Sequence, residues 1–351
     1  MIKIVSFYLV VLLFPLNLLS QPEMAEPDLL FTIGYEYFPK FGAEDIPGAM
    51  ALEYHNGHLY LAFLDKILKI DMQGNVVWSI KQKGADNIFD IAFYKDQLVV
   101  YQPASWNNLT FYNDTIKTKA VFVHFYASNE KELTERPATY NFGAVRFIIN
   151  LDDQLYFHDG YSYFPFSNFS QIEVKNHENI LKRNLEVFVN KDLPKPIAGY
   201  PISECKLVKA AYGPELQKDF YNLKIIDFCN KDTIISILSK HLPFDTCSSC
   251  KIHVGEFFKN EHINKYFSVS SRSWKTDKSR ELDRMVVFLD ENFEIEKICH
   301  SLEYLQNNIG LSPPQIASFT YDEFGNVYYC TNSFDHSNKS NSFVKIYKIK
   351  Y

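Results

Sequence analysis

Short apolar runs separated by polar turns extend along most of the chain, and residues 57–80 show the pattern most clearly. Residues 58–63, 66–71 and 76–80 alternate apolar and polar positions, and the turn between the last two runs holds Gln73 and Gly74. Alternation with a period of two is typical of strands that bury one face. Asn56-Gly57 precedes the first run and predicts a tight hairpin, because both residues tolerate positive φ.

The unit of apolar strand, acidic or Asn/Gly turn and apolar strand occurs six times by our count, mostly at intervals of roughly 40 to 60 residues, as in propeller blades. The units cover residues 49–80, 88–101, 145–157, 223–238, 265–298 and 316–350. The wider interval between the third and fourth units indicates an insertion or a further unit. Residues 176–183 and 214–221 mix charges at helical spacing and predict short helices between units.

One such sheet cannot cover both of its faces, so neighbouring sheets must stack, and a closed ring leaves no exposed end. We therefore predict an all-β fold: a β-propeller of six four-stranded antiparallel blades that occupies residues 21–351. The apolar run at residues 343–349 is expected to pair with residues 29–33, because such a clasp covers two strand edges at once. A large β-sandwich or two β-domains are the alternatives.

A family resemblance rests on the turn before Trp78. Residues 70–78, IDMQGNVVW, resemble the D-x-x-G-x-x-x-W turn of quinoprotein-like and NHL-like propeller repeats, and residues 288–295 echo it without the Gly or the Trp. With its N-terminal apolar segment and abundant Phe and Tyr, the chain resembles exported six-bladed propeller proteins of Bacteroidetes-type bacteria. The resemblance implies the fold and export. The chain has only 13 Gly among 351 residues, which is unusual for such folds.

The N-terminus has the pattern of a signal peptide. Lys3 is followed by an almost wholly apolar run from Ile4 to Leu19, which Pro15 and Asn17 interrupt. The run is shorter than the ~20 residues that a bilayer core requires, so we predict a signal peptide at residues 1–20. An uncleaved anchor is the alternative. No later segment approaches a membrane span, and we expect a secreted, periplasmic or cell-envelope protein.

The charge balance disfavours partners that require a basic surface. The chain carries 36 Lys and Arg against 42 Asp and Glu, and removal of Lys3 with the signal peptide changes the net charge from −6 to −7. Nucleic acids and anionic membranes would need a basic patch, which the sequence lacks. Aromatic residues make up 16% of the chain, with 30 Phe and 23 Tyr, and favour pleated, half-buried surfaces.

Two segments are candidates for a binding surface. Residues 157–166 contain His158, Asp159, Tyr161 and Tyr163, with Gly160 and Pro165 favouring a loop, and Trp106 lies in a second predicted loop. Exposed rings in loops can form a platform for a protein or glycan partner. The alternative for the first segment is an aromatic hairpin packed between blades.

The six cysteines all lie in the second half of the chain. Cys247 and Cys250 form the closest pair and predict a loop disulfide in an oxidising compartment. A zinc site that adds His241 and His253 is the alternative. Cys229, Cys299 and Cys330 have apolar neighbours and are expected to be buried as small hydrophobes. The sequence predicts no metal site of higher specificity and identifies no cofactor.

Three function classes remain open. The first is a binding module for a protein or glycan partner that uses loops on one face. The second is a propeller-fold hydrolase, active on lactones or glycans, with carboxylates or a metal in its central channel. The third is a structural component of the cell envelope. Motifs such as G-x-S-x-G and H-E-x-x-H are absent, and the sequence leaves enzymatic activity undecided.

Overall fold

A computed structural model of the chain describes part of its length. The described residues are 22–38, 49–81, 88, 90–94, 96–102, 108–125, 145–151, 154–160, 167–175, 178–182, 200–203, 206–211, 220–227, 230, 233–242, 251–260, 262–275, 280–300, 318–333, 335 and 338–351. Within them the regular elements are strands, apart from the 3-10 turns η1 (Tyr35–Tyr37) and η2 (Lys339–Asn341). None of their helical segments is long and apolar enough to cross a membrane.

The strands follow one another in antiparallel groups of four. The first group is β3 (Ala51–His55), β4 (His58–Ala62), β5 (Lys66–Asp71) and β6 (Val76–Lys81). The second is β7 (Asp90–Tyr94), β8 (Gln97–Gln102), β9 (Asn108–Asn113) and β10 (Ile116–Phe125). The third is β11 (Val145–Leu151), β12 (Gln154–Gly160), β13 (Ser167–Lys175) and β14 (Glu178–Lys182).

The second half of the chain repeats this order. The fourth group is β15 (Tyr200–Ser203), β16 (Lys206–Ala210), β17 (Phe220–Asp227) and β18 (Thr233–His241). The fifth is β19 (Lys251–Asn260), β20 (Lys265–Lys275), β21 (Arg280–Leu289) and β22 (Ile295–His300), to which β1 (Glu23–Ala25) adds in parallel. The last is β23 (Ser318–Tyr321), β24 (Val327–Ser333), β25 (Phe343–Ile349) and β2 (Asp28–Gly34).

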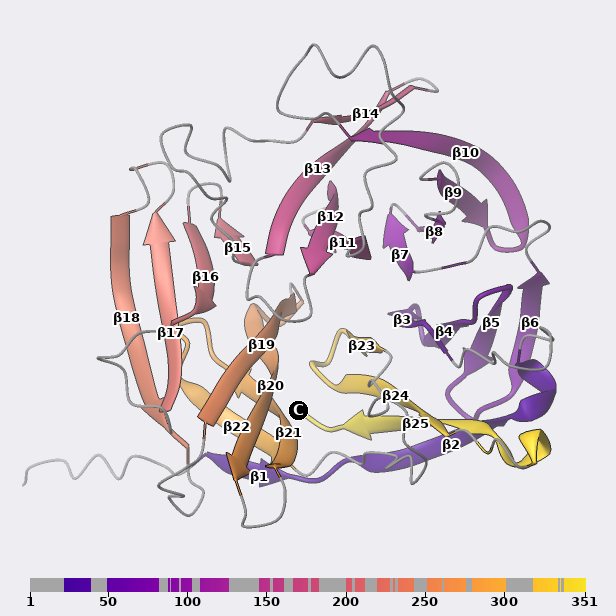
Figure 1. Cartoon of the computed structure of the whole chain (residues 1–351). Helices are drawn as coiled ribbons and strands as arrows, with labels where there is room; N and C mark the ends of the chain where they lie inside the picture. The colour runs from indigo at the N-terminus through magenta and orange to yellow at the C-terminus, as the bar shows by residue number, and fades with distance from the viewer. Residues whose placement is uncertain are drawn as a thin grey trace, which may run out of the picture.

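The sheets stand around a common centre, with the first strand of each group innermost (Figure 1). The innermost strands β23, β3, β7 and β11 contact one another in that order. The prediction of an all-β propeller is thereby confirmed. The number of blades stays a prediction, because β10 and β14 pair in parallel and join the second and third groups into one eight-stranded sheet.

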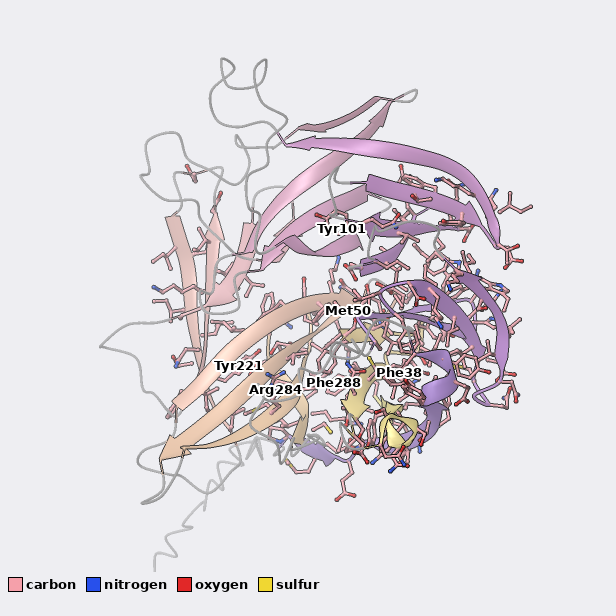
Figure 2. All side chains as sticks on the ribbon, turned by 45° about the vertical axis from the view of Figure 1, so that its right-hand side comes forward. Phe38, Met50, Tyr101, Tyr221, Arg284 and Phe288 are labelled. Carbon is pink, nitrogen blue, oxygen red and sulfur yellow. The ribbon has the colours of Figure 1, made fainter. Side chains whose placement is uncertain are left out.

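Strand alternation explains how each blade supports its neighbours. In β4, Leu59 and Leu61 face a core shared with the last group, where they join Tyr328 and Ile346. The intervening Tyr60 faces a second core shared with the second group. Successive side chains on a strand point to opposite faces, so a blade buried on both faces has apolar residues at consecutive positions. Figure 2 shows side chains between the sheets of the first and last groups.

The ring is closed by pairing the two ends of the described chain. β25 lies between β24 and β2, with Thr32 opposite Lys345 and Ile33 opposite Val344. The predicted clasp is confirmed, and Figure 1 shows the indigo β2 beside the yellow β25. η1 contacts η2, and Phe38, labelled in Figure 2, lies beside the C-terminal strands and is 1% exposed. The N-terminal segment therefore connects two blades, β1 to the fifth group and β2 to the last.

One prediction of local structure was wrong. Residues 178–182, expected to be helical, form β14, whose backbone pairs with both β13 and β10. Residues 220 and 221, at the end of the second predicted helix, begin β17. Pairing with adjacent strands overrides a weak charge periodicity, because each paired residue satisfies its backbone groups in the sheet.

Three strand connections have the same turn, built around an aspartate. Asp71 Oδ1 accepts the backbone N–H of Gln73 (3.0 Å) and Asn75 (2.8 Å), and its Oδ2 accepts the side-chain amide of Asn75 at 2.9 Å. The side-chain hydrogen bond from Asn75, together with those from the backbone, holds the pKa of Asp71 below its usual range. Asp322 accepts the N–H groups of Phe324 and Asn326 at 2.9 Å each. The fourth residue of each turn has positive φ: 89° at Gly74, 89° at Gly325 and 62° at Phe293, in the turn of Asp290.

We predict that Gly74→Ala destabilises the protein more than Gly57→Ala. Both glycines have positive φ, which costs a non-glycine residue about 1 kcal/mol. A Cβ on Gly74 would lie 2.9 Å from Cβ and Cγ of Phe31, whereas a Cβ on Gly57 meets nothing within 4 Å. Chemical denaturation of the two variants should therefore give a larger loss of unfolding free energy for Gly74→Ala. Equal losses would contradict the predicted contact with Phe31.

We also predict that removal of residues 344–351 abolishes cooperative unfolding. The deletion removes nearly all of β25 and leaves β2 without its partner, so two edges of the last blade become exposed. Thermal unfolding followed by circular dichroism should lose its sharp transition. Removal of Lys350 and Tyr351 alone, which leaves β25 intact, is the control and should keep the transition. A deletion variant as heat-resistant as the full chain would exclude the clasp as a major source of stability.

Candidate functional site

The innermost strands of the first and last groups meet in a polar seam that we identify as the candidate site. Thr320 Oγ1 on β23 donates a hydrogen bond to Glu53 Oε2 on β3 at 3.0 Å and accepts the backbone N–H of Tyr54 at 3.0 Å. Ser318 Oγ, also on β23, donates to the backbone oxygen of Leu52 at 3.3 Å. Side-chain hydroxyls of the last blade therefore bind both the backbone and a carboxyl group of the first.

Glu53 is the most perturbed acid of this seam. Loss of hydration raises its pKa to about 8, and the hydrogen bonds from Thr320 and from the backbone of Tyr54 oppose that shift only in part. Desolvation disfavours the charged form of a carboxyl group, so Glu53 keeps its proton near neutral pH. A neutral acid that accepts one hydroxyl hydrogen bond can still donate its own proton to another group.

A stacked tyrosine pair continues the seam toward the Asp322 turn. The rings of Tyr54 and Tyr328 lie 5.6 Å apart and are parallel within 1°. Tyr328 donates its hydroxyl to Asp322 Oδ2 at 2.8 Å, so one carboxylate holds both the turn and the stack. Burial raises the pKa of Tyr54 to about 12, and its hydrogen bond to Glu323 adds to this rise. Both tyrosines are therefore neutral hydrogen-bonding groups at physiological pH.

The other end of the seam is fixed by Asn332 of β24. Its amide oxygen accepts the backbone N–H of Ala49 at 2.9 Å, and its amide nitrogen donates to the carbonyl of the same residue at 3.0 Å. The side-chain amide of Asn332 therefore binds both backbone groups of Ala49, as a neighbouring strand would. The seam thus extends from Asn332 through Thr320 to Asp322 and joins the two blades that close the ring.

Trp78, which carried the family resemblance, has a structural role between the first and second groups. Its Nε1 donates to Asp114 Oδ1 at 2.6 Å, in the turn between β9 and β10. Its ring meets that of Tyr60 edge to face, with centroids 5.8 Å apart, and Lys69 lies 3.8 Å from the same aspartate. Nearby, His55 stacks on Phe93 at 3.9 Å, and burial lowers the pKa of this histidine.

Most of the binding residues predicted from the sequence lie outside the described residues. Trp106, Tyr161 and Tyr163 do so. His158 and Asp159 belong to β12, where they pair with Phe169 and Asn168 of β13. Residues 157–160 of the predicted loop are therefore strand residues, because backbone pairing with β13 continues to Gly160, and residues 161–166 lie outside the described residues. The side chains of His158 and Asp159 are not described.

The cysteines divide in the same way. Cys299 and Cys330 are buried free thiols, which confirms the prediction for these two. Cys229 and the predicted disulfide pair, Cys247 and Cys250, lie outside the described residues. His241 and His253, the further ligands of the alternative zinc site, are at the end of β18 and within β19. Among the residues that the structure describes, no group of three or more His, Cys, Asp or Glu is placed to hold a metal ion.

Sequence reasoning did not single out Glu53 and Thr320. The available signal was a lone acid within the short apolar run of residues 49–54, at a position where the alternation predicts a buried or interface side chain. Its partner is 267 residues away in the sequence, so no local pattern could identify Thr320.

We predict that Glu53→Gln makes the folded protein more stable at pH 8 than the parent chain. The pKa of Glu53 is about 8 in the folded chain and 4.5 when unfolded, so between these values the folded state binds more protons. The contribution of Glu53 to stability is then fully present below pH 4.5 and falls by up to about 1.4 kcal/mol per pH unit as pH rises toward 8. Glutamine keeps the acceptor for Thr320 and cannot titrate. Denaturation curves at pH 5, 6, 7 and 8 measure this dependence.

Glu26→Gln is the matched control, because Glu26 is an exposed acid between β1 and β2. The control should keep the pH dependence of the parent, whereas Glu53→Gln should flatten it. If the unfolding free energy of all three proteins changes with pH in the same way, Glu53 does not hold a proton in the folded state.

Comparison with known proteins finds similar structures but no sequence relative. No family model and no curated protein matches the chain. A DUF4221 family member from Bacteroides vulgatus has a TM-score of 0.47 at 13% identity, over 94% of this chain and 99% of that one. A Bacteroides caccae protein of unknown function scores 0.36 at 11% identity, over 73% and 88% of the two chains. BamB from Moraxella catarrhalis scores 0.34 at 11% identity, over 88% and 87%.

Proposed function

We propose that the chain is an exported binding module that recognises a protein or glycan partner through the connections at one rim of the propeller. The observation that carries this proposal is an asymmetry between the two ends of the strands. Connections from an odd-numbered strand to the next, such as β3 to β4 or β5 to β6, contain two to five residues between strand ends. Several connections from an even-numbered strand are much longer, including residues 126–144, 183–199 and 301–317.

The two kinds of connection leave the sheets at opposite rims. Strands in each group run antiparallel, so all odd-to-even turns lie at one end of the group and all even-to-odd connections start from the other. β10 and β14 pair in parallel, as expected if neighbouring groups have the same orientation. The rim with the short turns has too few residues in its connections to form a large recognition surface. Loops on a rigid scaffold are where binding residues concentrate, which favours the opposite rim.

The candidate binding residues belong to this second rim by their place in the sequence. Trp106 lies between β8 and β9, and Tyr161 and Tyr163 lie between β12 and β13, both even-to-odd connections. His158 and Asp159 occupy the end of β12 from which the second connection starts. We propose that these residues contact the partner, because Trp and Tyr supply large contact areas with few rotatable bonds.

We predict that Trp106→Ala combined with Tyr161→Ala and Tyr163→Ala weakens partner binding without a loss of thermal stability. The control replaces Phe324 and Ile116, both 69% exposed at the opposite, tight-turn rim, by alanine. Binding is measured by biolayer interferometry on a panel of polysaccharides and on purified cell-envelope proteins. Loss of binding in the triple variant but not in the control supports recognition by the rim that carries the even-to-odd connections. Equal binding by both, or loss only in the control, refutes it.

Export is part of the proposal and has its own test. When the full chain is expressed in a bacterium with a Sec pathway, we expect it outside the cytoplasm with Gln21 as its first residue, measured by fractionation and N-terminal mass spectrometry. Retention of residues 1–20 in the cytoplasmic fraction would show that these residues are not a cleaved signal.

A propeller hydrolase with a site near the central channel is the second candidate, and Glu53 is the observation that favours it. The residue lies on an innermost strand, and its raised pKa of about 8 is suited to general-acid chemistry near neutral pH. If this candidate were right, Glu53→Gln would abolish turnover of lactone or glycan substrates while raising stability at pH 8. A binding module predicts the stability change alone.

A further inference from the structure

The outermost strand of the fourth group, β18, has an exposed apolar edge. Ile234, Ile235 and Ile237 have 49%, 47% and 47% of their surfaces exposed, although all three lie within a nine-residue strand. Residues 233–239, TIISILS, contain no charge and no proline. β18 is the last strand of its sheet, bonded to β17 on one side only, and Figure 1 shows it as the outermost arrow on the left.

Bare edges of this kind are unfavourable, because their free N–H and C=O groups pair with other chains. The described outer strands of other groups are covered by another strand or expose fewer large apolar side chains. β22 is covered by β1, and β10 is covered by β14. β2 and β6 also have an open edge, but each has a single exposed large apolar side chain, Leu29 and Val77, both 52% exposed. Among the described outer strands, β18 stands apart in combining an open edge with a cluster of exposed isoleucines.

The molecule itself shows how such an edge can be covered. Parallel pairing of β10 with β14 joins two four-stranded groups through their outermost strands into one eight-stranded sheet. An equivalent joint between two molecules needs no change in either blade. Two-fold symmetry makes such a contact self-complementary and closed, so it ends at a dimer and does not continue into a fibre.

We propose that β18 pairs antiparallel with β18 of a second copy of this chain and forms an eight-stranded sheet across a two-fold axis. When this pairing is centred on Ser236, Ile235 of each copy lies opposite Ile237 of the other copy. The strand starts beside Asp227 of β17, the partner of Thr233, and it ends at Lys240 and His241. The acidic end of each strand therefore meets the basic end of the other, whereas a parallel arrangement would bring like charges together.

The test is the mass of the purified full chain in solution, measured by size-exclusion chromatography with light scattering from about 1 to 100 µM. We expect the parent to have twice the mass of a single chain at the upper concentrations. Ile237→Lys places a charge in the joint twice, once from each copy, and should weaken the dimer by at least about 10-fold in Kd, which corresponds to 1.4 kcal/mol. Ile116→Lys is the matched control, since Ile116 is 69% exposed on another blade, and it should leave the dimer intact.

Ile235→Lys provides an independent test if Ile237→Lys unfolds, and thermal unfolding of each variant shows which are folded. Amide hydrogen exchange of the parent should slow in residues 233–239 as concentration rises and stay unchanged in β6. A parent chain of single mass at 100 µM would overturn the proposal, even if it bound an added extended peptide at β18. A dimer that persists in both Ile235→Lys and Ile237→Lys would also overturn the proposal.

Discussion

The closure of the ring depends on one constraint: a strand near the start of the described chain, β2, must pair with its last strand, β25, in the same sheet. β2 supplies the outermost strand of the last blade, and β25 lies between it and β24. Without this pairing, the cores on both sides of the last blade would lose one wall, because Ile346 faces the first group and Tyr347 faces the fifth. Stability of neighbouring blades is therefore coupled through residues more than 300 positions apart.

The polar seam adds specificity to this closure. Apolar packing between stacked sheets tolerates sliding, whereas hydrogen bonds fix the register of one blade against the next. Asn332 binds both backbone groups of Ala49, and Thr320 binds Tyr54 and Glu53. A shift of one residue would place these side chains on the wrong face and leave polar groups buried without partners. The protonated state of Glu53 follows from the same packing, since closure removes water from its carboxyl group.

Much of the fold could be predicted because its information is local. Alternation identified the strands, and the end-to-end pairing of residues 29–33 with 343–349 followed from the need to cover an edge. The low glycine content is explained by the turns: Asn56, Asp96, Asp114 and Asn264 take positive φ, and Asn and Asp tolerate that conformation because their side chains bond locally. Even Phe293 does so, at a turn where the ring is buried against Tyr266 at 4.7 Å.

The features that could not be predicted depend on partners far away in the sequence. β1 has three residues and no distinctive pattern, and it is a strand only because β22 offers an edge in parallel register. β14 had helical spacing but takes its conformation from β13 and β10. The sequence around Thr320 is that of an ordinary strand, and its role depends on the contact of β23 with β3. Of the candidate binding residues, the structure describes only the backbone of His158 and Asp159, which the sequence had placed in a loop.

The alternating direction of the strands also allows the two rims of the propeller to differ. Because strands run antiparallel in each group, the chain visits the two rims in turn and can use them differently. At one rim, aspartates such as Asp71 and Asp322 hold short turns rigid, and Asp322 also binds Tyr328 of the seam. Insertions at the other rim cost only the modest entropy of a longer loop, so that rim can vary while the strands keep their register.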